Sequence, residues 1–63
     1  MSEPVTIARA NMLRSEAESA RSAKRAAILF RQAAAEFKKL NMIYAADRCD
    51  EKAEHYEKIG GEA

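Results

Sequence analysis

The 63-residue sequence has few of the residues that bridge, interrupt or enlarge a fold: one cysteine, one proline, two glycines and no tryptophan. A single cysteine excludes an intrachain disulfide, and with it the class of small secreted domains that disulfides hold together. No apolar run approaches the ~20 residues that cross a membrane, and the N-terminus lacks the basic and apolar blocks of a signal peptide. We therefore expect a protein of the cytoplasm with no membrane partner.

A strong charge of one sign is also missing. Eleven Lys and Arg against ten Asp and Glu leave a formal net charge of +1, which argues against nucleic acid as the main partner. Residues that could act in catalysis or bind a metal are also few. Cys49 lies on an apolar stripe as a packing residue, and the row of Asp47, Glu51 and His55 has too few ligands for a closed metal site. We expect no catalytic, cofactor or metal site, and a protein that is not an enzyme.

What the sequence has in abundance is alanine at helical spacing. Neither glycine nor proline occurs between Val5 and Ile59, and apolar residues recur every three to four positions in two runs. The runs meet at Asn41, and asparagine accepts the left-handed backbone conformation that ends helices. At 7.0 kDa the core is so small that we expect oligomerisation or a partner to support it.

These runs predict an all-α fold, an antiparallel helical hairpin that forms a single domain over residues 1–63. Its long first helix covers residues 4–40, and its shorter second helix covers residues 42–59. The two apolar faces meet in a hairpin core formed by Ala27, Phe30, Ala34, Phe37, Met42, Ala46, Cys49, Ala53 and Tyr56.

One segment of the first helix interrupts its apolar sector. Ser15, Glu16 and Ser19 intrude there, and Ser15 with Glu18 has the spacing of a capping box. A break near Ser19–Ser22 would turn the hairpin into a three-helix array. We prefer the single long helix because no strong helix breaker is present and serine in a helix costs only ~0.5 kcal/mol relative to alanine.

A continuous first helix would extend well beyond the second helix. Its N-terminal half would keep an apolar stripe that needs cover from another chain, formed by Val5, Ala8, Met12, Leu13 and Ala20. We expect this stripe to present an apolar groove to a partner helix. In a second interpretation, two copies pair through the stripe into an antiparallel homodimer; in a third, the basic first helix contacts a nucleic-acid backbone. Alternatively, the same residues fold back as a third helix and bury themselves.

The charge of the chain differs between its two halves. Residues 1–40 hold eight Lys and Arg against four Asp and Glu, and residues 41–63 hold three against six. An antiparallel hairpin therefore lays a basic helix beside an acidic one. Each exposed ion pair contributes only ~0.2 to 1 kcal/mol, so this charge pattern sets the register of the helices more than their stability.

The predicted hairpin has small residues where its two helices cross and aromatic rings one turn away. The residues of this pattern are Ala26, Leu29, Phe30, Ala33, Ala34, Phe37, Leu40, Asn41, Ala45, Ala46, Cys49, Ala53, Tyr56, Ile59 and Gly60. This pattern resembles the helical hairpin of tetratricopeptide repeats, in the variant of the soluble attachment proteins of vesicle fusion. Residues 26–37 and 52–54 are also similar to the microtubule interacting and trafficking domain. Both resemblances imply a binding scaffold whose groove accepts a partner helix.

Overall fold

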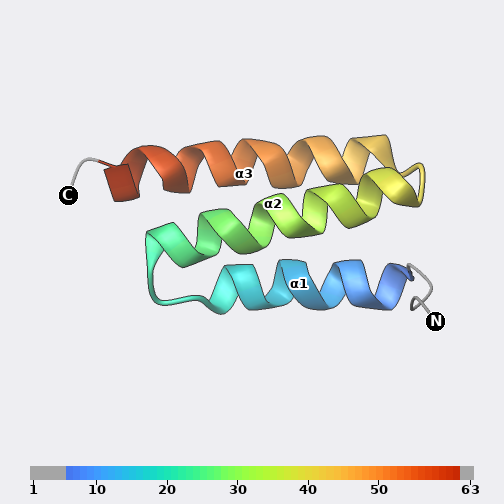
Figure 1. Ribbon diagram of the computed structural model, residues 1–63, viewed down its shortest axis with the longest axis horizontal. Coiled ribbons are helices and arrows are strands. Elements are labelled where there is room, and N and C mark those ends of the chain that lie inside the picture. Colours follow the sequence, from blue (N-terminus) through green and yellow to red (C-terminus); the bar gives the residue numbers. More distant parts are fainter. Residues whose placement is uncertain (1–5, 62–63) are drawn as a thin grey trace.

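The computed structural model describes residues 6–61, which form three α-helices and no strand. The helices are α1 (Ile7–Ser19), α2 (Ala23–Lys39) and α3 (Ile43–Gly61). Successive helices run in opposite directions, and α2 lies between α1 and α3 (Figure 1). The expected all-α class is confirmed, and the arrangement is the three-helix alternative.

The long first helix expected over residues 4–40 is wrong, because the chain turns between α1 and α2. Ala20 has extended backbone angles, and Ser22 caps α2 by accepting a hydrogen bond from the Arg25 N–H at 3.3 Å. Such a cap satisfies a backbone donor that would otherwise have no partner, and contributes ~1 kcal/mol. Folding back also buries Ala10 and Ala17, which a continuous helix would leave in water.

Helix α1 begins after Thr6, whose Oγ1 accepts a hydrogen bond from the Arg9 N–H at 3.1 Å. The start that the sequence places at Pro4 lies outside the described residues, as does Val5. Thr6 satisfies the same kind of backbone donor in α1 that Ser22 satisfies in α2.

The expected capping box at Ser15 does not begin a helix. Ser15 lies inside α1, and its carbonyl accepts a hydrogen bond from the Ser19 hydroxyl at 3.1 Å. The same hydroxyl lies 3.3 Å from the Glu16 carbonyl. Both contacts tie the Ser19 side chain to the last turn of α1, whereas Ser22 caps the start of α2.

The turn between α2 and α3 is built on Asn41, as the sequence indicates. Asn41 has a φ of 62°, the only positive value among the described residues other than glycine. The Met42 N–H donates to the Phe37 carbonyl at 2.9 Å, and the Asn41 N–H donates to the Lys38 carbonyl at 3.0 Å. Together these bonds form a Schellman motif, which satisfies the last carbonyls of α2 and reverses the chain.

Helix α3 continues through Gly60 to Gly61, so the expected end at Ile59 is corrected by two residues. Within residues 6–61, no helix is long and apolar enough to span a bilayer.

Small side chains let the three helices approach closely. Because α2 packs against both neighbours, its buried face is wide, whereas α1 and α3 each bury a narrow stripe. Phe30 and Phe37 are the large side chains that fill the space between the helices. The core comprises Ala10, Ala17, Ala26, Ala27, Leu29, Phe30, Ala33, Ala34, Phe37, Ala46, Cys49 and Ala53.

Candidate functional site

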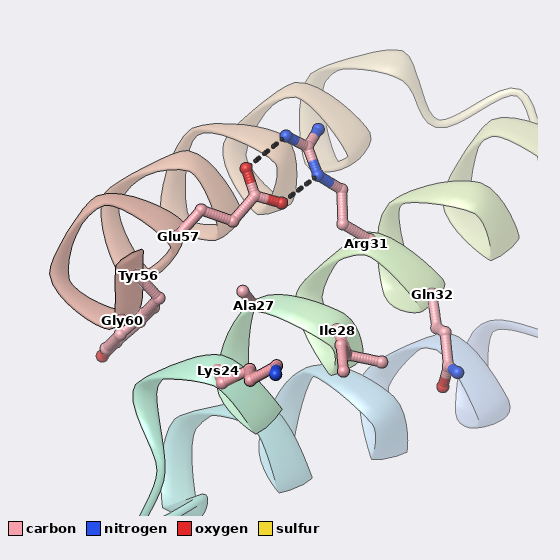
Figure 2. Close-up of a pocket in the computed structure, with 8 residues that line it drawn as sticks. All are labelled: Lys24, Ala27, Ile28, Arg31, Gln32, Tyr56, Glu57 and Gly60. Carbon is pink, nitrogen blue, oxygen red and sulfur yellow. Dashed lines mark hydrogen bonds and ion pairs between the residues drawn. The ribbon is translucent and has the colours of Figure 1, made fainter. Parts of the chain in front are cut away.

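A hollow of about 530 Å³ lies between α2 and α3, near the end of the molecule where α2 begins and α3 ends. Ile28 stands on its α2 side with 52% of its surface exposed. We call this hollow the α2–α3 groove. Figure 2 shows the residues that line it: Lys24, Ala27, Ile28, Arg31, Gln32, Tyr56, Glu57 and Gly60.

Two small residues line the α2–α3 groove where the two helices approach each other closely. Ala27 contributes a single methyl group from α2, and Gly60 contributes no side chain from α3. A Cβ atom added at Gly60 would lie 3.5 Å from the Lys24 backbone nitrogen and 3.8 Å from the Ala23 Cβ, which are ordinary contact distances. The two helices therefore approach closely here.

An ionic clasp, formed by Arg31 with Glu57 and Asp50, joins α2 to α3 beside the groove. Figure 2 shows its contact between Arg31 and Glu57. Arg31 Nε and Nη2 donate to the two Glu57 carboxylate oxygens at 3.1 and 3.0 Å, and Nη1 donates to Asp50 Oδ1 at 3.1 Å. Lys38 Nζ lies 3.3 Å from Asp50 Oδ2. The hydrogen bonds from Arg31 lower the pKa of Glu57, and the same pairing raises the pKa of Arg31.

Tyr56 forms an aromatic wall of the groove by stacking on Phe30. The two ring centroids are 5.7 Å apart and the planes differ by 9°. Lys52 Nζ lies 5.6 Å from the Phe30 ring centroid, and the His55 ring meets Tyr56 edge-on at 5.4 Å. The contacts with Phe30 and His55 orient the Tyr56 ring, so the wall is formed in the protein without a partner.

A second, smaller hollow of about 280 Å³ lies between α1 and α3. The Arg48 guanidinium lies 5.8 Å from the Tyr44 ring centroid and donates to the Tyr44 hydroxyl at 3.4 Å. Burial raises the pKa of the Cys49 thiol, which keeps it protonated and a weak nucleophile. The lining residues are Arg14, Tyr44, Ala45, Arg48, Cys49 and Lys52.

The stripe that the sequence predicts as a partner interface is divided by the fold. Leu13 and Ala20 are half-buried and pack against the core, whereas Ala8 and Met12 are exposed. Val5 lies outside the described residues. Because α1 folds back on α2, these residues do not form the continuous uncovered surface that a long helix would have left.

The residues predicted for the hairpin core lie on the inner faces of α2 and α3 and in the turn between them. Met42 and Tyr56 are half-buried and pack against the core. The others are buried: Ala27, Phe30, Ala34, Phe37, Ala46, Cys49 and Ala53. Ala10 and Ala17 of α1 join the same core.

The row of Asp47, Glu51 and His55 is exposed on α3. In the part of the chain that the structure describes, no three His, Cys, Asp or Glu residues are grouped so that they could hold a metal ion.

Helical periodicity does not single out Ile28, which lies ~160° around α2 from Phe30 and thus off the apolar stripe. Its neighbours one turn away are Lys24, Arg31 and Gln32. A large apolar residue among polar residues on an outer face is the signal that could have found it.

Comparisons with known protein families, with curated proteins and with solved structures found no match to this chain.

Proposed function

We propose that this chain is a protein-interaction module that receives an amphipathic helix of a binding partner in the α2–α3 groove. The observation that carries the proposal is Ile28, a large apolar side chain that is half exposed beside a hollow lined by Ala27, Tyr56 and Gly60. A half-exposed isoleucine alone is ordinary on a protein surface. Beside a preformed hollow, it belongs to the kind of surface that a partner covers.

The shape of the groove favours a helix as its occupant. Helices α2 and α3 run antiparallel and side by side (Figure 1), and the furrow between two packed helices accepts the side-chain ridge of a third. Such a helix would place apolar residues at positions i, i+3 or i+4, and i+7 in the groove. The hollow itself, of about 530 Å³, is the room available for these anchors.

The charges around the groove define the flanks of that helix. Lys24 and Arg31 line its α2 side, and Glu57 lines its α3 side. Lys24, at the α2 rim, has no ion-pair partner within residues 6–61. A partner helix with carboxylates over α2 and cations over α3 would meet opposite charge on both sides.

Selection from a phage-displayed library of helix-forming peptides tests the proposal. We expect the selected peptides to share apolar anchors at helical spacing with carboxylates on one flank. We expect their affinity to fall at least ~10-fold on the Ile28→Asp variant, because the charge would be buried at the centre of the contact. Met12→Asp is the matched control, since Met12 is 53% exposed and lies on α1. Failure to select any such peptide, or equal binding to Ile28→Asp, would refute the proposal.

Binding is favoured over catalysis because the displaced pKa values have structural causes. Those of Arg31 and Glu57 follow from their mutual pair, and that of Cys49 follows from burial. A nucleic-acid backbone is a weaker candidate partner, because many cations of α1 and α2 already meet carboxylates of this chain. These cations are Arg9 with Glu36, Arg14 with Glu18, Arg31 with Asp50 and Glu57, and Lys38 with Asp50.

The resemblance of residues 26–60 to a tetratricopeptide hairpin supports the same proposal. Helices α2 and α3 joined at Asn41 supply the two antiparallel helices that such a hairpin requires. Proteins with that hairpin, and those with the microtubule interacting and trafficking domain, act as binding scaffolds. On this proposal α1 covers one side of the hairpin, and the α2–α3 groove is left for the partner.

A further inference from the structure

The α2–α3 groove and an apolar side chain suited to fill such a groove lie on the same face of one molecule. Ile28 projects beside the hollow, and Tyr56 and Gly60 line its opposite side. A surface that carries both a projecting apolar group and a hollow is the kind that can complement itself. In a two-fold dimer, each copy offers its projection to the other copy and receives one in return.

The charge of this face is also divided in a self-complementary way. The charged residues that line the groove are Lys24 and Arg31 on α2 and Glu57 on α3, so its α2 side is basic and its α3 side is acidic. The ionic clasp uses only part of this charge. Within the described chain, Lys24, which lines the groove on α2, has no ion pair, so its charge can act on a neighbouring molecule.

These charges decide between the two ways in which the face can meet itself. A two-fold axis that runs along the groove places α2 of one copy over α3 of the other, so that basic faces acidic. An axis that runs across the helices would place α2 over α2, and like charges would repel. The first axis also leaves each facing pair of helices antiparallel, because α2 and α3 already run in opposite directions (Figure 1).

The axis along the groove also fixes which residues meet. A pure rotation about it keeps each residue at its own level along the helices. Ile28 lies near the level of Tyr56, which stacks on Phe30, and Lys24 lies at the level of Gly60. Ile28 of one copy therefore comes against the Tyr56 and Gly60 side of the other copy's groove.

We propose that the occupant of the α2–α3 groove is a second copy of this chain, bound face to face about an axis along the groove. This inference rests on the proposed function, because it names the helix that the groove receives. The contact centres on a small hollow, whereas stable interfaces bury roughly 800 Å² on each partner, so the association is expected to be weak. A weak pair of this kind would form where the chain is locally concentrated.

Sedimentation equilibrium of the whole chain tests this inference. From about 10 µM to about 1 mM, the wild type should pass from monomer to dimer, since that range brackets weak interfaces. Ile28→Asp should raise the dissociation constant at least ~10-fold, because it places a charge at the centre of the contact. Met12→Asp, an equally exposed position on α1, should leave it within ~2-fold, as expected for a site outside the interface.

A second variant and a salt series test how the helices are arranged in the dimer, while circular dichroism checks that the fold is intact. Lys24→Glu keeps the apolar surface intact and should weaken the dimer several-fold while the circular dichroism of the helices is unchanged. Raising the salt from about 50 mM to about 500 mM should also weaken the dimer, since basic α2 faces acidic α3. A dimer that salt strengthens would place like charges together and overturn the arrangement.

The remaining outcomes are equally decisive. A wild-type dimer that Ile28→Asp leaves intact overturns the inference, as does a chain that stays monomeric up to ~1 mM, the upper end of the weak-binding range. Neither result touches the proposed function, because the peptide selection measures the groove in a monomer as well as in a dimer. If the chain forms the dimer but the peptide selection yields no peptide that binds the groove, the proposed function is refuted.

Discussion

Arg31 joins α2 to α3 through hydrogen bonds to two carboxylates, although 44% of its side-chain surface is exposed to water. Exposed ion pairs contribute little when each partner has many conformations. Here the planar guanidinium meets Glu57 with two parallel bonds and Asp50 with a third, and such forked geometry loses less entropy for each bond formed. The clasp therefore sets the register of the two helices beside the groove.

The pairing of Glu57 predicts how stability depends on pH. Arg31 lowers the pKa of Glu57 in the folded protein, so the ionised carboxylate stabilises the fold above the unfolded pKa of ~4.3. This contribution is lost as the pH falls through the lower, folded pKa. Urea unfolding at about pH 7 and about pH 3 should show a smaller loss on acidification for Glu57→Gln than for the wild type.

The control for this experiment is Glu54→Gln, which changes a carboxylate of α3 with no ion pair among the residues that the structure describes. Its loss of stability on acidification should match that of the wild type. If Glu57→Gln and Glu54→Gln behave alike at both pH values, the pairing of Glu57 with Arg31 does not stabilise the fold.

The sequence predicts the burial of Phe30 but does not predict the groove, and the reason is physical. Phe30 shares a helical face with the alanines around it, so the period of the helix alone predicts its burial. The clasp and the groove depend on the register between two helices, which places Arg31 opposite Glu57 and Ile28 beside Gly60. That register arises from packing across the whole core, so the spacing of residues within one helix does not predict it.

At the scale of elements, the break between α1 and α2 depends on small free-energy contributions from helix propensity, capping and burial. A serine in a helix differs from alanine by only ~0.5 kcal/mol, so local propensity does not separate one helix from two. Burial of Ala10 and Ala17 against α2 adds to the cap at Ser22 and favours the turn. The sequence contains the capping serine, but the contribution of burial becomes visible only in the fold.

The cap gives a prediction for Ser22. Ser22→Ala should lower the free energy of unfolding by ~1 kcal/mol, because the Arg25 N–H loses its acceptor. Ser22→Asp should keep most of the stability, since a carboxylate accepts the same bond and favours a helix N-terminus. Urea unfolding followed by circular dichroism measures both variants.

Ser15→Ala is the matched control, since Ser15 lies within α1 and its side chain is not a cap. It should be neutral or stabilising by up to ~0.5 kcal/mol. A Ser22→Ala variant as stable as the wild type, or a Ser22→Asp variant as unstable as Ser22→Ala, would contradict this account of the break.

Across the whole molecule, α1 is held less firmly than the other two helices. Its fully buried side chains are Ala10 and Ala17, with Leu13 and Ala20 half-buried. Helices α2 and α3 instead share the Phe30 and Tyr56 stack and the ionic clasp. Stabilisation by burial scales with apolar area, so small side chains supply less of it.

This difference predicts the order in which the helices open. Amide hydrogens of α1 should exchange with solvent at least ~10-fold faster than those in the middle of α2, because partial opening can release α1 while the α2–α3 pair persists. Hydrogen–deuterium exchange followed by nuclear magnetic resonance measures each helix separately. Equal protection of α1 and α2 would show instead that the three helices open as one unit.

The odd number of helices has a mechanical consequence. Three passes leave the start of α1 and the end of α3 at opposite ends of a body 39 Å long (Figure 1). Proteins fused to the two ends would be held apart by the length of the helical body, whereas a two-helix hairpin would have brought them close together. Dyes attached there would accordingly sit at a separation suited to resonance energy transfer.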